Sequence, residues 1–356
     1  MDLLNDLASA GMPSSSAVTY RAGRTTAEVP ILEIKDLTVE FRHRGRTIRA
    51  ANRLSLSVFE GETLGIVGES GSGKSVLCRT ILRLIPSPPA FIESGEIHFA
   101  GRNLLSLSER EIQSVRGAEI SMIFQNPMNA LNPIWPIGDQ ITEGERVLGR
   151  LQGRAARQRA IELLRRVGIP SPELRVDEYP HQWSGGMLQR AVISMAISRE
   201  PRLILADEPT TALDVTIQDQ ILALLMELQE ATGTTLVLVS HDMAVVAETC
   251  DRVAVMYAGR IIELASTANV FSQPRHPYSL GLLQSIPRID SETQSLIPIS
   301  GQPPNLAGLS PGCSFAPRCK FASPECWISE IALREVKPGH FSACLKAEDL
   351  VEGGAP

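Results

Sequence analysis

The chain has 356 residues, of which 43% are hydrophobic and 21% charged, and its formal net charge is -6. This composition excludes a disordered or fibrous protein, and the length predicts a large core divided over two or three domains. A mild negative charge without a basic patch argues against a nucleic-acid-binding protein.

The apolar runs and the start of the chain predict a soluble, cytoplasmic protein. Apolar runs are short, such as TLVLV at 235–239, whereas a bilayer span needs about 18 residues. The first thirty residues lack the pattern of a secretory signal, so we expect a disordered tail over 1–30 and a second short tail over 349–356. Cytoplasmic thiols stay reduced, which argues against disulfides in the cysteine-rich C-terminal segment.

The first half of the chain alternates between strand and helix signals. Alternating residues at 31–41 and 54–58, joined by a basic turn at 42–49, predict an antiparallel sheet with one solvent-facing side. A buried strand then leads through GESGSGKS (68–75) into a largely buried helix. Residues 135–199 show helical periodicity only, which is typical of an inserted helical subdomain.

The second half returns to strands. RLILADEP (202–209) and TLVLVSHD (235–242) read as buried strands separated by a helix, and VAVMYAGRIIEL (253–264) as a hairpin. Strands that alternate with helices predict a parallel α/β sheet. The regular pattern ends near Pro274, where we expect a separate small module to begin.

GESGSGKS matches the phosphate-binding loop pattern G-x-x-x-x-G-K-[ST] between a strand and a helix. Its backbone N–H groups and the helix start would surround phosphates, Lys74 would reach the β- and γ-phosphates, and the Ser75 hydroxyl would ligate Mg²⁺. A plain glycine-rich turn is the weaker interpretation. The candidate binding residues are Gly68, Glu69, Ser70, Gly71, Ser72, Gly73, Lys74, Ser75 and Val76.

Two further segments carry polar groups that suit phosphate chemistry. LILADE (203–208) ends in two carboxylates, of which Asp207 would hold Mg²⁺ and Glu208 would face the water that attacks the γ-phosphate. By itself this pair could be a solvated loop, but after a phosphate loop it is the expected partner. In WSGGMLQR (183–190), Ser184 can cap a helix whose positive end forms an anion site, although capped helices are common.

Six motifs in order, GESGSGKS, FQNP, SGGM, LILADEP, TALD and SHD, resemble the nucleotide-binding domain of ATP-binding cassette (ABC) proteins. The resemblance implies a P-loop NTPase of the α/β class over residues 31–273. It implies a RecA-like core, an antiparallel β subdomain and a helical subdomain over about 135–199, with a small cysteine-containing C-terminal module added to it. It also implies an ATPase that uses ATP and Mg²⁺.

The resemblance assigns roles to single residues. It implies that Phe41 stacks on adenine, that Gln125 senses Mg²⁺ and the attacking water, and that Glu208 is the catalytic base. It further implies that His241 contacts the γ-phosphate and that Asp214 lies at a dimer interface. Lys74 joins Glu208, His241 and Gln125 among the candidate catalytic residues.

The resemblance also implies that two cassettes pair head to tail, so that Ser184, Gly185, Gly186 and Met187 close on ATP held by the partner's phosphate loop. Neither half-site can stabilise the γ-phosphate charge alone, so ATP would join the dimer and hydrolysis would release it. The general family motif is LSGGQ, whereas this chain has WSGGM, and Met187 cannot supply the side-chain hydrogen bond of a glutamine.

Five stretches resemble the ATPase subunits of oligopeptide, dipeptide and nickel importers. They are FQNPMNALNP (124–133), YPHQWSGGM (179–187), HPYSLGLLQSIP (276–287), ISGQPPNL (299–306) and GCSFAPRC (312–319). The resemblance implies a C-terminal extension over 274–348 specific to that branch. It implies two transmembrane permease subunits, an extracytoplasmic solute-binding protein and a second ATPase subunit, which is either a copy of this chain or, as the branch favours, a homologous subunit. The subunit would act as part of a translocase on the cytoplasmic side of the cell membrane.

The function implied is ATP hydrolysis coupled to uptake of oligopeptides or dipeptides. Import of nickel or another small solute by the same family is an alternative. A non-transport ABC ATPase acting on nucleic acid or the ribosome is a second alternative, but the sequence shows none of the coiled-coil insertions, tandem cassettes or basic arms of such proteins, and we expect no nucleic-acid partner.

Four cysteines in the C-terminal segment have the spacing C-x5-C-x6-C-x17-C. They are Cys313, Cys319, Cys326 and Cys344. A structural zinc site usually includes a C-x2-4-C pair, which is absent here, whereas a [4Fe–4S] cluster tolerates wider spacing. The resemblance favours the cluster, with a structural role, while zinc and unmetallated thiols remain alternatives. Cys78 and Cys250 are expected to be small buried hydrophobes.

Overall fold

The computed structural model describes residues 29–43, 45–211, 213–285, 298–309, 311–328 and 330–351. Most of the predicted tail over 1–30 and the end of the tail over 349–356 lie outside these residues. The chain divides into two compact units. Unit 1 comprises Met1–Phe59, Thr63–Asn103 and Ser240–Pro356, and unit 2 comprises Glu60–Glu62 and Leu104–Val239.

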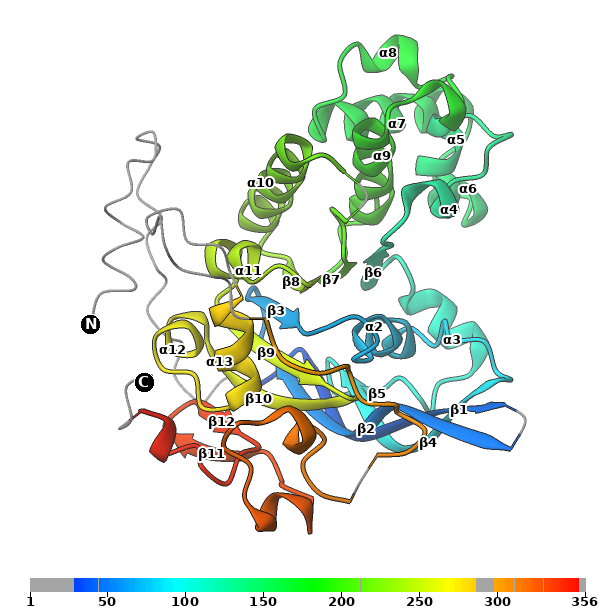
Figure 1. Cartoon of the computed structure of the whole chain (residues 1–356). Helices are drawn as coiled ribbons and strands as arrows, with labels where there is room; N and C mark the ends of the chain where they lie inside the picture. Colours follow the sequence, from blue (N-terminus) through cyan, green and yellow to red (C-terminus); the bar gives the residue numbers. More distant parts are fainter. Residues whose placement is uncertain are drawn as a thin grey trace. The chain divides into compact units, whose positions relative to one another are not determined.

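Unit 1 contains an antiparallel sheet with the strand order β2-β1-β4-β5 (Figure 1). Its strands are β1 (Leu32–His43), β2 (Arg46–Val58), β4 (Ala90–Phe99) and β5 (Arg102–Asn103). The antiparallel sheet predicted from the alternating residues is therefore confirmed.

The connection between β1 and β2 is shorter than the basic turn predicted over 42–49. Both strands continue into that segment because Glu40 accepts hydrogen bonds from Arg42 (Nε, 3.2 Å) and, across the strand pair, from Arg49 (Nε, 3.0 Å). Opposite charges on neighbouring strands stabilise pairing. Basic residues that suggested a turn are thus part of the sheet.

Unit 1 also contains a second group of neighbouring strands, in the order β11-β12-β10-β9-β3. Its strands are β3 (Thr63–Val67), β9 (Arg252–Tyr257), β10 (Arg260–Ser266), β11 (Arg334–Lys337) and β12 (His340–Ser342). β3 and β9 are parallel, whereas β9 and β10 form the predicted antiparallel hairpin. The helices of this unit are α2 (Lys74–Ile81), α11 (Met243–Thr249), α12 (Thr267–Ser272) and α13 (Pro277–Gln284), with short 3-10 turns η2 (Ala316–Arg318), η3 (Pro324–Trp327) and η4 (Asp349–Val351).

Unit 2 is built around parallel strands in the order β8-β7-β6. These are β6 (Ile120–Ile123), β7 (Leu203–Asp207) and β8 (Thr235–Ser240). The helices are α3 (Glu109–Val115), α4 (Pro127–Ala130), α5 (Ile137–Ile141), α6 (Glu143–Val147), α7 (Gly153–Arg166), α8 (Pro172–Arg175), η1 (Pro180–Gln182), α9 (Gly185–Ile197) and α10 (Val215–Thr232) (Figure 1). Residues 135–199 are all described and contain helices but no strand.

The C-terminal extension is not the separate module that the loss of regular pattern suggested. Its strand β12 pairs with β10, so that the extension lengthens the sheet of unit 1. Buried His340 lies 2.7 Å (Nε2) from buried Glu263 of β10, and Arg275 donates to the carbonyl oxygen of Ala347 (Nη1, 3.0 Å). A short, proline-rich segment buries too little surface to form its own core, so it packs on an existing sheet edge. The domain limits predicted from the sequence stay predictions.

Candidate functional site

The glycine-rich loop lies in unit 1, between β3 and α2. Gly68 has φ +153° and Gly73 has φ +104°, in the region that favours glycine. A Cβ at Gly68 would lie 2.1 Å from the carbonyl oxygen of Met256, and one at Gly73 would lie 2.1 Å from that of Ala50. Both positions therefore require glycine, and the loop is pressed against two backbone carbonyls.

Lys74 lies at the first turn of α2 and is 4% exposed. Its ammonium donates to the carbonyl oxygens of Gly68 (2.7 Å) and Glu69 (3.1 Å), so the side chain folds back across the loop. A buried cation is stable only with such partners. Phosphate oxygens can replace these carbonyls as acceptors, and the first N–H groups of α2 have no side-chain cap because the residue before Lys74 is a glycine.

The two predicted carboxylates lie in unit 2 at the end of β7. Asp207 is fully buried, and Glu208 has the unusual φ of +47°. Such backbone conformations persist where surrounding contacts hold them, and they occur often at functional sites. The Glu208 carboxylate accepts hydrogen bonds from Gln125 (Nε2–Oε2, 2.9 Å) and Thr211 (Oγ1–Oε2, 2.9 Å), while its backbone N–H donates to Val239 (3.1 Å).

The SGGM segment begins α9 in unit 2. The Ser184 hydroxyl accepts a hydrogen bond from the N–H of Met187 (3.4 Å), which confirms its predicted role as a helix cap. A Cβ at Gly186 would lie 2.8 Å from a methyl group of Ile217, so this glycine allows α9 to pack closely on α10. Ser184 and Gly185 remain exposed at the helix start, where backbone N–H groups favour an anion.

Comparison with known families gives two matches along the chain. The family described as "ABC transporter" matches residues 51–211, and "Oligopeptide/dipeptide transporter, C-terminal region" matches residues 262–326. A probable peptide ABC transporter ATP-binding protein of Sinorhizobium fredii is 48% identical over 90% of this chain and 96% of its own length. The oligopeptide transport ATP-binding protein OppD of Bacillus subtilis is 48% identical over 87% of each chain.

The chain belongs to the ABC transporter ATP-binding proteins. It is an ATPase of this family. Among solved structures, the dimeric ATP-binding cassette MJ0796 bound to ADP and Pi is 28% identical, with a TM-score of 0.59 over 66% of this chain and 98% of the cassette. CbiO1 of Clostridium perfringens, part of an ABC transporter complex, is 29% identical with the same TM-score. The P-loop NTPase fold predicted from the sequence is confirmed.

The contacts described above do not include three of the predicted ABC site residues. Phe41 is half-buried on β1, Asp214 is exposed directly before α10, and His241 is exposed directly after β8. Their predicted roles stay predictions. Within unit 2 the structure does bring Gln125 to Glu208, although 83 positions separate them.

Two residues outside the six cassette motifs contact the ABC phosphate loop within unit 1. The Tyr278 hydroxyl accepts a hydrogen bond from the backbone N–H of Glu69 (2.8 Å), and the guanidinium of Arg318 pairs with the Glu69 carboxylate. Both lie in stretches that carry the resemblance to the importer branch, HPYSLGLLQSIP and GCSFAPRC, where neither residue has a predicted role. Spacing alone could not connect them to a loop 209 and 249 positions away.

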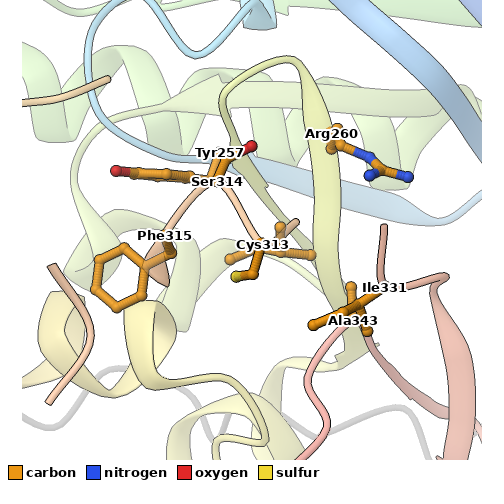
Figure 2. A pocket seen from close by; sticks show the side chains of 8 residues that line it. Tyr257, Arg260, Cys313, Ser314, Phe315, Ile331 and Ala343 are labelled. Carbon is orange, nitrogen blue, oxygen red and sulfur yellow. The ribbon is translucent and has the colours of Figure 1, made fainter. Parts of the chain in front are cut away.

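The four C-terminal cysteines line one small cavity, together with apolar side chains such as Phe315 and Phe321. Burial raises the pKa of Cys313 and Cys319 above the usual thiol range and that of Cys344 to about 12, so these thiols are protonated at neutral pH. Figure 2 shows Cys313 in a neighbouring pocket, with Phe315 on one side and Ile331 and Ala343 on the other.

The predicted metal site at these cysteines is not confirmed. Within the described residues, no group of three or more His, Cys, Asp or Glu side chains could hold a metal ion as arranged. The thiols share a cavity, but their arrangement in the described residues shows neither an iron–sulfur cluster nor zinc. Cys78 and Cys250 are buried, as predicted for small hydrophobes. In the described residues no helix has the length and apolar character needed to cross a membrane.

Proposed function

We propose that this ABC ATPase subunit couples ATP hydrolysis to the uptake of oligopeptides or dipeptides through partner permease subunits. The observation that carries the proposal is the oligopeptide/dipeptide transporter C-terminal region at 262–326, in the same chain as the cassette. The relatives named above are described as peptide and oligopeptide transport proteins, and a dipeptide transport ATP-binding protein of Bacillus subtilis is 48% identical over 81% of this chain.

The residues that we propose to bind ATP lie in unit 1. Backbone N–H groups from Gly68 to Val76 and the ammonium of Lys74 bind the phosphates, Phe41 stacks on adenine, and His241 contacts the γ-phosphate. The buried position of Lys74 supports its part, because its ammonium lies against the loop carbonyls of Gly68 and Glu69 and a charge-assisted hydrogen bond to a phosphate is stronger than one to a neutral carbonyl.

The residues that we propose to act on the attacking water lie in unit 2. Glu208 is the proposed general base, and Gln125 orients it through the 2.9 Å hydrogen bond. The residues that would hold Mg²⁺ are Ser75, Asp207 and Gln125, whose hydroxyl, carboxylate and amide oxygens are the hard donors that Mg²⁺ prefers. Because Nε2 of Gln125 faces Glu208, its carbonyl oxygen is the atom left for a metal. Bound Mg²⁺ would offset part of the charge of the triphosphate.

The remaining proposed roles concern assembly. Ser184, Gly185, Gly186 and Met187 would contact ATP held by a second cassette, and Asp214 would lie at that interface. We propose a homologous ATPase subunit as the second cassette, two permease subunits and an extracytoplasmic solute-binding protein as partners, and the cytoplasmic side of the cell membrane as the location. The exposed start of α9 supports the contact with an anion from outside the chain.

The four cysteines are proposed to hold a [4Fe–4S] cluster that stabilises the extension, with zinc as the competing occupant. The support is that all four thiols line one cavity. Since burial raises the pKa of Cys313, Cys319 and Cys344, metal binding would have to displace the protons of these thiols. Protein prepared without oxygen should contain iron and acid-labile sulfide. Colourless protein without either would refute the cluster, and one equivalent of zinc would replace it.

The transport proposal is tested with the reconstituted complex of this subunit, its permeases and the solute-binding protein. Oligopeptides or dipeptides should stimulate ATP hydrolysis and enter vesicles, whereas Ni²⁺ should do neither. Stimulation by Ni²⁺ and not by peptides would favour the alternative solute. Co-purification with ribosomes or nucleic acid in place of permeases would refute a transport function.

A further inference from the structure

Every polar group of Glu69, the second residue of the phosphate loop, has a partner in unit 1. Its carboxylate accepts two parallel hydrogen bonds from Arg318, Nη1 to Oε2 at 2.8 Å and Nη2 to Oε1 at 3.0 Å. Its N–H donates to the hydroxyl of Tyr278 (2.8 Å), and its carbonyl oxygen accepts from the ammonium of Lys74 (3.1 Å). Two of these partners come from the C-terminal extension, 249 positions away in the case of Arg318.

Arg318 is built into the extension and is not a mobile surface cation. Its side chain is only 6% exposed, and its Nε donates to the carbonyl oxygen of Ser300 (2.9 Å). The guanidinium carbon lies 5.9 Å from the ring centres of both Tyr257 and Phe315. Hydrogen bonds to the Glu69 carboxylate and the Tyr257 hydroxyl raise the pKa of Arg318 further above its ordinary value, so it is charged at any physiological pH.

This geometry distinguishes the pair from an ordinary surface salt bridge. Exposed pairs contribute little, because water screens them and both side chains lose freedom on pairing. Here the arginine is already fixed by Ser300 and two aromatic rings, and a bidentate pair sets the orientation of the carboxylate as well as its charge. A carboxylate left alone on this loop would repel the phosphates of an incoming nucleotide.

We propose that Arg318 is a positioning residue for ATP binding, which acts from the C-terminal extension by holding Glu69 and offsetting its negative charge beside the phosphate loop. The inference rests on the proposed assignment of that loop as the phosphate site. The C-terminal extension thereby contributes to the nucleotide site. Because the segment between Cys313 and Cys319 carries Arg318, any change that moves this segment changes the affinity for ATP.

The test compares variants in the full transporter complex, with the KM for ATP and kcat measured separately. Arg318→Met keeps the packing of the aliphatic stem but removes the charge, and it should raise the KM about tenfold while kcat stays within about twofold. Adding Glu69→Gln to Arg318→Met removes the uncompensated charge and should return the KM to within about threefold of the unmodified protein. A purely structural loss would not be rescued by this second change.

Arg334→Ala is the matched control. Arg334 lies in the same extension and forms a similar two-bond pair with Glu348 (2.8 and 3.0 Å). Neither bond involves the phosphate loop, so the variant should leave the KM for ATP unchanged. Should Arg318→Met fail to fold, judged by thermal unfolding, Arg318→Lys takes its place, with a smaller rise in KM that Glu69→Gln again reduces.

An unchanged KM in the folded Arg318 variant would overturn the inference, and so would a raised KM that Glu69→Gln does not lower. Lys74→Ala identifies failure of the underlying site. If that variant binds ATP normally, the phosphate-loop assignment and the inference both fall. If it loses ATP binding while Arg318→Met does not, only the inference is wrong.

Discussion

Gln125 donates a hydrogen bond from Nε2 to the Oε2 of Glu208, over 2.9 Å, and so connects the end of β6 with the end of β7 inside unit 2. Thr211 donates to the same carboxylate oxygen. A general base works best when its orientation is set before substrate arrives. The pair therefore gives the proposed base a defined position within unit 2.

Glu208→Gln should reduce kcat by at least about 100-fold while ATP binding is retained, because the amide keeps the shape of the side chain but cannot accept a proton. Single-turnover hydrolysis and nucleotide binding measured on the same preparation check this. The variant should also accumulate as an ATP-bound dimer of cassettes. Normal hydrolysis would remove Glu208 from the role of base.

Gln125→Ala removes the hydrogen bond that orients Glu208 but leaves the carboxylate in place. We expect kcat to fall about tenfold with little change in ATP affinity, since the loss concerns the chemical step. The Glu208→Gln change should then cost less in this background than alone, because the two residues act together. Fully additive effects in this double variant would contradict the coupling.

Gly73→Ala tests the close approach of the phosphate loop to β2. A Cβ there would lie 2.1 Å from the carbonyl oxygen of Ala50, and φ is already +104°, so we expect a loss of about 3 kcal/mol in the free energy of unfolding. Gly101→Ala is the control, because Gly101 has φ +79° but open space around the added atom. It should lose only about 1 kcal/mol from backbone strain. Equal losses in urea unfolding would show that the clash is unimportant.

The β1–β2 hairpin should respond to acid through Glu40. Hydrogen bonds from Arg49 and Arg42 lower the pKa of Glu40 below its usual value of 4.5. A carboxylate with a lowered pKa in the folded state stabilises the protein above the unfolded pKa, and this contribution disappears as the pH falls through the folded value. Between pH 5 and pH 3, Glu40→Gln should therefore show a weaker loss of unfolding free energy than the unmodified protein. An identical pH dependence would contradict this.

The sequence alone was sufficient for features whose chemistry depends on adjacent residues. The loop GESGSGKS, the strand that ends in Asp207 and Glu208, and the serine that caps α9 all depend on local backbone geometry, and each lies where predicted. Alternating apolar residues likewise predicted the antiparallel sheet, because the side-chain period of a strand is local. The same local pattern predicted a turn between β1 and β2 that is longer than the observed one, because it does not reveal the pairing of Glu40 with Arg49.

Only the tertiary structure decided which distant residues meet. It placed Gln125 on Glu208 across 83 positions, Arg318 on Glu69 across 249, and β12 on the edge of β10. It gathered four cysteines around one cavity but, in the residues it describes, not into a group that could hold a metal. Such contacts follow from the packing of elements on a shared sheet, which composition and spacing along the chain do not encode locally.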